Sequence, residues 1–292
     1  MIEQALYEHL IAQTELTERL TTYNGVPAVF NQKAPADSDE LWAAGPQYPR
    51  LVFFVDLQGD PARTMGGSLA IDIQCPEDGT PPEELEPVVR DLIHGWFFSG
   101  GGFVASAQWK ESRYFTEPTE QVVGSTLSFD LLAFPTLTTD EPDVIDRING
   151  WTAELDEGLH VINYVDLPSS AWRPADGESA VYWRLVQDAP AGWIPDTFQT
   201  IWRTATVRGH IFSQDIQTAN QASRLIIRGL YTVKRLLRSG EAPIMVNSRN
   251  TDDLTADPLR TGQLTVEATY GVVVWTKTKQ RFQHIEIKRG DI

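Results

Sequence analysis

The chain has 292 residues, of which 41% are hydrophobic, so it is long enough for two domains with cores of their own. No apolar run approaches the roughly 20 residues that span a membrane as a helix. The single cysteine, Cys75, excludes an internal disulfide, and the net charge of −16 disfavours close contact with nucleic acid.

The excess of acidic residues lies entirely in one half of the sequence. Residues 1–150 contain 24 acids and 8 bases, whereas residues 151–292 contain 16 of each. The simplest role of such a charge is solubility. The opening segment MIEQALYEHL has two glutamates and no basic stretch, so the sequence predicts no secretory signal and favours synthesis in a reducing cytoplasm.

Patterns in the first half predict a helix, a short strand, two longer strands, a second helix and a closing pair of strands. Apolar residues recur at helical spacing over residues 2–20, and an alternation of period two marks a strand over residues 67–75. A polar loop, residues 33–49, separates the first two strands. The other predicted strands cover residues 26–32, 50–57, 103–117 and 122–134.

The second helix of this half is predicted from the segment TPPEELEPVVRDLIHGWFF, residues 80–98. Thr80 and Glu83 have the spacing of a capping box, with Pro81 at the first helical position. Pro87 lies deeper, which predicts that the first turn is a separate short piece.

A run of three glycines, Gly100–Gly102, follows this helix and raises the question of a phosphate site. Phosphate cradles lie at helix N-termini, and this run follows a helix. The second half has SG at the corresponding place, with Gly240. We therefore interpret the glycines as a left-handed helix stop.

The second half repeats the same order of elements. The sequence predicts a helix over residues 142–155, strands at 160–167, 180–186 and 204–214, a long helix over 218–240, and a closing pair at 242–248 and 262–275. The repeat has an offset of about 138 residues. Thr80, Leu69, Ile73, Val88, Val89 and Leu92 align with Thr218, Val207, Ile211, Ile226, Ile227 and Leu230, and Leu127 and Phe129 align at 137 with Leu264 and Val266.

The repeat predicts an α+β protein of two tandem domains, residues 1–137 and 138–292. Each is expected to contain a mostly antiparallel or mixed sheet of four to five strands packed with two helices. The first domain is strongly acidic and the second is neutral. The alternative is two unrelated α+β units that share an order of elements.

Residue types that carry chemistry are scattered. The five histidines form no pair with metal-ligand spacing, and the segment ADSDE, residues 36–40, lacks the glycine and the final glutamate of a calcium loop. Asp56, Asp60 and Asp72 could meet as paired acids, but no counterpart exists in the second half. The sequence predicts no enzyme, no cofactor and no metal site.

Two groups of residues are candidates for protein contacts. The first is a basic stripe on the long second-half helix. The first-half helix has the opposite sign, with the acids Glu83, Glu84, Glu86 and Asp91. These two charged faces are either simply solvated, or they set the register between neighbouring copies. The second consists of loop aromatics, which are either lids on the core or interface anchors. The predicted interface residues are Arg224, Arg228, Arg235 and Arg238, with Trp42, Tyr48, Trp172 and Trp193.

Three stretches of the first half resemble the tail-terminator family of tailed bacteriophages, also called tail-completion or neck proteins. They are EQALYEHLIAQTELTERL, YPRLVFFVDLQGD and LAIDIQCPEDGTPPEELEPVVRDLIHGWF. The second half resembles the family only through the internal repeat. Family members usually have one domain, so the doubled length departs from their pattern.

The resemblance implies a structural virion protein that forms a ring at the head-proximal end of a phage tail, without a cofactor. Such a ring ends the tail tube, docks to the head connector and contacts the tube protein and, in contractile tails, the sheath. DNA would pass through it without specific binding. Six chains would give two rings and are favoured over three chains in one pseudo-sixfold ring.

Three other functions remain as alternatives. The chain could be another phage structural component, such as a head–tail joining or baseplate protein. It could be an enzyme built on Asp56, Asp60 and Asp72. It could also be a cytoplasmic module that binds a small ligand through its loop tryptophans.

Overall fold

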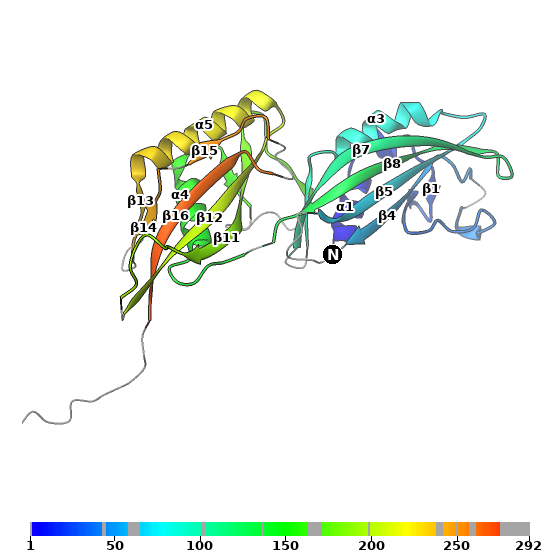
Figure 1. Ribbon diagram of the computed structural model, residues 1–292. Coiled ribbons are helices and arrows are strands. Elements are labelled where there is room, and N and C mark those ends of the chain that lie inside the picture. The colour runs from blue at the N-terminus through cyan, green and yellow to red at the C-terminus, as the bar shows by residue number, and fades with distance from the viewer. Residues whose placement is uncertain are drawn as a thin grey trace, which may run out of the picture.

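The computed structural model describes residues 2–42, 45–57, 65–100, 103–135, 137–162, 171–197, 199–237, 242–248, 250–256 and 261–274. These residues form a mixed α+β structure with two seven-stranded sheets, a two-stranded ribbon and five α-helices (Figure 1). The two sheets lie end to end along the long axis of the molecule.

The first sheet has the strand order β10-β6-β7-β8-β5-β4-β3. Its strands are β3 (Val29–Asn31), β4 (Arg50–Leu57), β5 (Met65–Pro76), β6 (Phe97–Gly100), β7 (Phe103–Glu117), β8 (Val122–Ala133) and β10 (Ala171–Trp172). Its other elements are α1 (Ile2–Ile11), α2 (Thr14–Thr17), α3 (Pro82–Ile93), the 3-10 helix η1 (Glu40–Trp42) and the ribbon β1 (Thr22–Tyr23) and β2 (Val26–Pro27).

The second sheet has the order β13-β14-β16-β12-β11-β9, with β15 also paired to β16. Its strands are β9 (Leu159–Val161), β11 (Ser179–Pro190), β12 (Thr200–Phe212), β13 (Arg235–Leu236), β14 (Ile244–Val246), β15 (Thr251–Asp252) and β16 (Leu264–Val273). Two helices pack on it, α4 (Val144–Leu155) and α5 (Ile216–Val233).

The two halves share one strand order. In each, a short edge strand runs parallel to its neighbour, and every other pair in the series is antiparallel. The register agrees as well, because Leu69 lies opposite Phe129 in the first sheet and Val207 lies opposite Val266 in the second. The positions that the sequence aligns on these strands are therefore structurally equivalent.

The α+β class is confirmed, but the predicted sheet sizes and helix count are wrong. Both sheets have seven strands rather than four or five, and the first half has three helices because the predicted helix over residues 2–20 breaks into α1 and α2. The three-residue strands β3, β9 and β14 coincide with predicted strands, whereas β10, β13 and β15 were not predicted, since two residues show no periodicity. Strand β10 belongs to the predicted second domain yet pairs with β6 of the first sheet, so the division at residue 137 stays a prediction.

The helix starts differ from those predicted. Helix α3 begins after Pro81, which has no side-chain cap, and it continues through Pro87. Helix α5 begins after Asp215, whose carboxylate accepts hydrogen bonds from the backbone N–H groups of Gln217 and Thr218 at 2.8 Å. The predicted helix caps at Thr80 and Thr218 are therefore wrong. Helix α3 has Pro82 at its first position, and α5 is capped by the carboxylate of Asp215 rather than by the hydroxyl of Thr218.

The buried faces of these two helices also correct the alignment by one residue. Leu85, Val89 and Ile93 are buried on α3, and Ala222, Ile226 and Leu230 on α5. The offset between the helices is therefore 137, rather than the 138 predicted from Val88, Val89 and Leu92.

The glycine run does not end a helix. Helix α3 ends at Ile93, and Gly95 supplies the left-handed residue with a φ of 76°. Gly100 ends strand β6, so the run lies between two antiparallel strands, and Gly101 and Gly102 lie outside the described residues. In the second half Lys234, with a φ of 55°, takes this conformation, so α5 ends before Gly240, which is also outside the described part.

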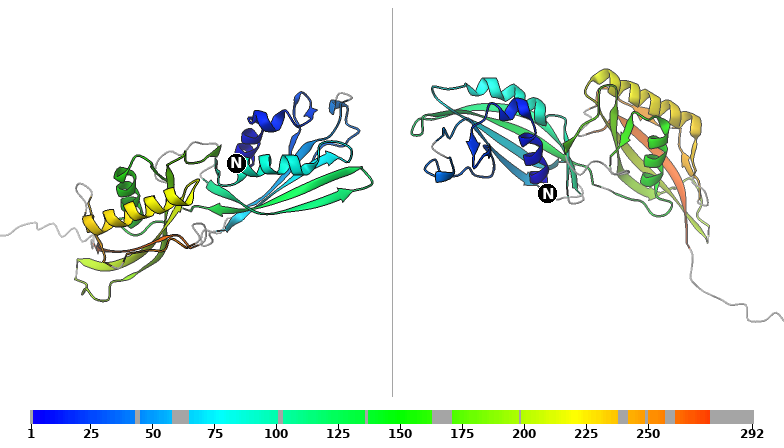
Figure 2. Two further views of the ribbon diagram at one scale, coloured as in Figure 1. Left: turned by 90° about the horizontal axis from the view of Figure 1, so that it is seen from above. Right: turned by 180° about the vertical axis from the view of Figure 1, so that it is seen from behind.

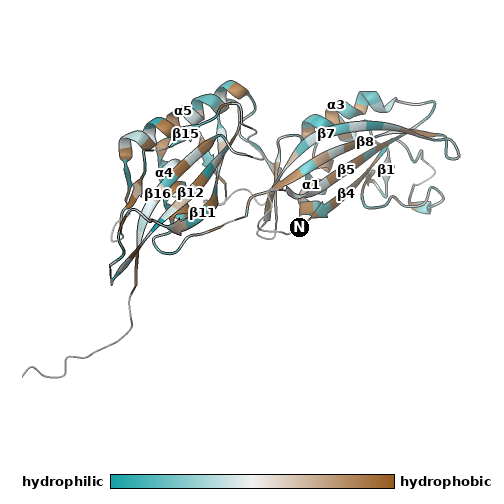
Figure 3. Ribbon diagram, in the orientation of Figure 1, coloured by the Kyte–Doolittle hydropathy of each residue, from teal (hydrophilic) through white to brown (hydrophobic). Residues whose placement is uncertain are grey.

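Three apolar clusters hold the molecule together. Each half has its own core between its sheet and helices, and Figure 3 shows apolar and polar residues interleaved along the strands of both sheets. A third core joins the halves, because Phe97, Leu132 and Phe134 pack with residues from the second half. Those partners are Ile162, Ala180, Tyr182 and Phe212. Together with the β10–β6 pairing, this joint core ties the two halves to each other.

Candidate interaction surfaces

The basic stripe predicted on α5 is shorter than expected. Arg224 and Arg228 are both exposed and lie four residues apart on the helix, so they share a face. Arg235 is exposed but lies past the helix, in strand β13, because the left-handed Lys234 turns the chain. Arg238 lies outside the described residues. The stripe on α5 therefore consists of two arginines.

The equivalent helix of the first half has the opposite charge. Glu83, Glu84 and Asp91 are exposed on α3, while Glu86 is half-buried and accepts a hydrogen bond of 2.6 Å from the hydroxyl of Tyr114. That bond raises the pKa of Tyr114 to about 12. Both helices lie on the same side of the molecule, as the view from above in Figure 2 shows.

Two of the four loop aromatics pack within the first half. Trp42 is 3% exposed, donates its indole N–H to the carbonyl of Ala36 at 3.0 Å and contacts the rings of Tyr23 and Phe30, so it is a lid on the core. The guanidinium of Arg50 lies 4.3 Å from the ring centre of Tyr48.

The hydroxyl of Tyr48 links the polar loop to the turn after β7. It donates to Asp37 at 3.0 Å and to Glu120 at 3.3 Å, and burial raises its pKa. Arg50 completes the group with an ion pair of 2.7 Å to Asp37. Tyr48 therefore orders the end of the first half that is remote from the joint core.

The other two aromatics lie in the second half. Trp172 is half-buried in β10, and its ring centre is 5.3 Å from that of Phe97, so it packs at the junction. Trp193 is 67% exposed. It stands at an open pocket of about 600 Å³ that Ala189, Thr204 and Glu267 also line. Among the four, Trp193 has the ring most accessible to a partner.

A larger cleft of about 1140 Å³ lies between the halves. Val88, Asp91 and Leu92 of α3 line one wall, and Ile216 and Ala219 of α5 line the other. Ile216 is 72% exposed at this cleft. The sequence did not lead us to predict the cleft. Ile216 follows the helix cap directly and lies outside the buried stripe, and this position was a signal for an exposed apolar contact.

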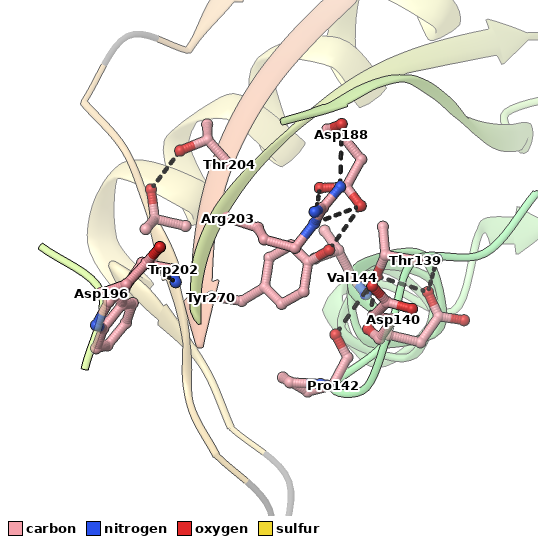
Figure 4. Close-up of polar contacts among 12 residues, drawn as sticks. Thr139, Asp140, Pro142, Val144, Asp188, Asp196, Trp202, Arg203, Thr204 and Tyr270 are labelled. Atoms are coloured by element: carbon pink, nitrogen blue, oxygen red, sulfur yellow. Dashed lines mark hydrogen bonds and ion pairs between the residues drawn. The ribbon is translucent and has the colours of Figure 1, made fainter. Parts of the chain in front are cut away.

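A polar network joins three strands of the second sheet (Figure 4). The Nε atom of Arg203 lies 3.0 Å from both carboxylate oxygens of Asp188, and the hydroxyl of Tyr270 donates to the same carboxylate at 2.8 Å. The Asp188 contact raises the pKa of Arg203, and burial raises that of Tyr270 to about 12. These three groups satisfy one another, which is typical of a structural network.

Figure 4 also shows the polar contacts around this network. The backbone N–H of Trp202 donates to Asp196 at 2.9 Å, and that of Val144 donates to the hydroxyl of Thr139 at 2.9 Å. The sequence reading missed the network because its residues come from β11, β12 and β16. Only the pairing of these strands brings them together.

The three aspartates considered for acid–base chemistry do not form a described cluster. Asp72 lies opposite Val52, four positions from Asp56 along β4, which separates the two by about 13 Å. Asp72 instead accepts a hydrogen bond of 2.6 Å from Thr126, and Asp60 lies outside the described residues.

The described residues contain no group of three histidine, cysteine or acidic side chains placed to hold a metal ion. Within the same part of the chain, no helix combines the length and apolar character needed to cross a membrane.

The chain matches no protein-family model, no curated protein and no solved structure.

Proposed function

We propose that this chain is a structural subunit of a tailed-phage particle, which assembles with copies of itself into a ring at the head-proximal end of the tail. The ring would end the tail tube, dock to the head connector and let DNA pass without specific binding. The acidic first half supports the last point, because a negative lining repels phosphates.

One observation carries this proposal: two sheets of the same strand order lie end to end, with unlike tips at opposite ends of the molecule (Figure 1). The joint core contains Ala180 at the start of β11 and Leu132 near the end of β8. The turn after Pro190 and the turn after Glu117 therefore lie at the strand ends remote from the junction.

Unlike tips are what a head-to-tail contact requires. A heterologous interface uses two different patches on each copy and closes into a ring when the rotation permits. The second-half tip offers the exposed ring of Trp193 beside an open pocket, and the first-half tip offers Tyr114, which is 57% exposed, with the acids Glu117 and Glu120. We expect these two tips to meet between neighbouring copies.

Strand edges provide a second joint near the first-half tip. Strand β6 pairs with β7 only up to Ser106, so in the described residues the outer edge of β7 carries no strand from Gln108 to Glu117. Such an edge can accept a strand or loop of a neighbour. Joined tip to tip, six chains would close one ring, in which acidic and neutral halves alternate rather than form separate rings.

The test is the mass and shape of the purified protein. Native mass spectrometry and negative-stain images should reveal closed rings, with six chains favoured over three. A chain that stays monomeric at high concentration would contradict the proposal.

A pair of variants tests the contact itself. Trp193→Asp should abolish rings and leave the melting temperature unchanged, since this side chain is 67% exposed. The matched control is Val26→Asp, at an exposed residue of the ribbon (46%), which should assemble normally. Equal assembly of both variants would remove Trp193 from the interface.

A further inference from the structure

The helix-covered side of the molecule carries opposite net charges on two equivalent helices, α3 being acidic despite Arg90 and α5 being basic. Helix α3 exposes Glu83 and Glu84, and helix α5 exposes Arg224 and Arg228. The described part of the chain gives none of these four side chains an ion-pair partner. Helix α5 contains no acidic residue at all. The side therefore has one region of net negative charge and one of net positive charge.

Helix α3 ends at the cleft between the halves, and helix α5 begins there. The C-terminal part of α3 and the first turn of α5 both line the cleft between the halves, and both helices face the same side (Figures 1 and 2). A two-fold axis that lies in the plane of this face, passes over the cleft and runs across the long axis of the molecule would place α3 of one copy over α5 of the other. The same operation would place α5 over α3, so both contacts form together.

The positions of the charges along the helices fit such an axis. With a rise of 1.5 Å per residue, Glu84 and Glu83 lie about 14 and 15 Å from Ile93, which ends α3 at the cleft. On the same basis Arg224 and Arg228 lie about 12 and 18 Å from Ile216, which begins α5 at the cleft. The two carboxylates of one copy therefore fall between the two guanidinium groups of the other.

The cleft at the centre of this side exposes apolar side chains among polar ones. Ile216, 72% exposed at the cleft, lies close to the axis, with Val88 and Leu92 on the facing wall. A second copy would cover these residues, and covered apolar area is the main favourable term in association. The charges around it would fix the orientation, because like helices placed over each other would repel.

We propose that the side formed by α3, the cleft and α5 is a self-complementary docking surface for a second copy of this chain. The proposal adds a two-fold contact to the head-to-tail contact of the proposed ring. Both contacts together generate two rings that face each other with dihedral symmetry, whereas the two-fold contact alone generates a dimer.

Charge reversal tests the surface. Arg224→Glu with Arg228→Glu should raise the dissociation constant of the two-fold contact at least about tenfold, because four attractive pairs become repulsive. In sedimentation velocity or native mass spectrometry, the mass should fall to half. Glu83→Arg with Glu84→Arg should have the same effect alone, and the combination of all four changes should restore pairing.

Two further measurements separate this contact from others. The control Lys33→Glu makes the same charge change as the single reversal Arg224→Glu, at an exposed residue off both helices, and should leave pairing intact. Raising the salt to about 1 M should weaken pairing of the wild type by screening the charges. Circular dichroism melts should be unchanged in every variant, since all five positions are exposed.

The outcomes are distinguishable from those of the ring. Loss of the two-fold contact converts paired rings into single rings, whereas Trp193→Asp converts either form into species without rings. Three results would each overturn the proposal. The first is a wild-type chain that never pairs through this side, and the second is normal pairing of the Arg224→Glu, Arg228→Glu variant. The third is a failure of the variant with all four changes to restore pairing.

Discussion

The two halves have the same strand order and differ in how the equivalent positions are filled. Phe53 lies opposite Ile71 in the first sheet, whereas Trp183 lies opposite Gly209 at the equivalent place in the second. A large ring in one half is therefore compensated by a missing side chain across the strand. Strand pairing is therefore common to both halves, while each core is filled by side chains of its own set of volumes.

The surfaces differ more than the cores. Strand β7 has 15 residues and extends the first half into a long hairpin, whereas its counterpart β14 has three. Helix α3 has 12 residues with an acidic face, and α5 has 18 with a basic one. Inward positions are constrained by the shared fold, and outward positions are free to follow whatever each half contacts.

The largest effect is expected from a change in the joint core that uncouples the two halves. Phe97 is 2% exposed in the joint core, within 5.6 Å of the rings of Trp172, Phe134 and Phe212. Phe97→Ala should cost about 3–5 kcal/mol and split one calorimetric transition into two, because the cavity lies where the halves join. A single transition, shifted or not, would show that the joint core does not couple them.

A matched control for this variant lies in the first half's own core. Phe129 is 1% exposed and contacts only that core. Phe129→Ala should lower the melting temperature of the first half while the coupling between the halves persists. The contrast between the two variants measures the coupling itself.

The next largest effect is expected from exchanging a packed pair of one half for the equivalent pair of the other. A β-carbon on Gly209 would lie 2.7 Å from Cζ3 of Trp183, so Gly209→Ile should destabilise the second half by about 1–3 kcal/mol. Trp183→Phe in the same chain recreates the Phe53–Ile71 pair of the first half and should recover part of that loss. Urea denaturation of the two single variants and the double variant gives the coupling, and additive costs would contradict it.

The long helices and strands could be predicted from the sequence because each shows its hydrophobic periodicity over many residues. Alternation over 67–75 placed Ile71 and Ile73 in the core, and the aligned offsets of 137 and 138 matched the strand register. Strands of two residues, such as β10 and β13, depend on tertiary pairing and left no pattern. Helix starts were wrong because α3 begins at Pro82 without a side-chain cap and because Asp215, rather than Thr218, caps α5.

The candidate surfaces were predicted in part. Arg224 and Arg228 are exposed as their helical spacing suggested, and so is Trp193. The burial of Trp42 depends on Tyr23 and Phe30, which pack around it from outside its own loop. The cleft and the network of Arg203 could not be foreseen, since each arises from elements distant in sequence.

The smallest effect concerns the two helix starts. Asp215 caps α5 through three hydrogen bonds to Gln217 and Thr218, whereas α3 begins without a side-chain cap. Asp215→Ala should lower the melting temperature of the second half at pH 7 by about 2–4 °C. Thr80→Ala should leave that of the first half within about 1 °C, because Thr80 caps nothing.

The pH dependence of this difference follows from the pKa of Asp215. Its hydrogen bonds with Thr218, side chain and backbone, hold that pKa below the ordinary value of 3.8. Because the folded-state pKa is depressed, the stabilisation is present above pH 3.8 and is lost as the pH falls through the folded value. Asp215→Asn keeps an acceptor without a titrating group, so melts of this variant between pH 7 and pH 2 should lose less stability than the wild type. Equal losses would show that the carboxylate does not cap α5 in solution.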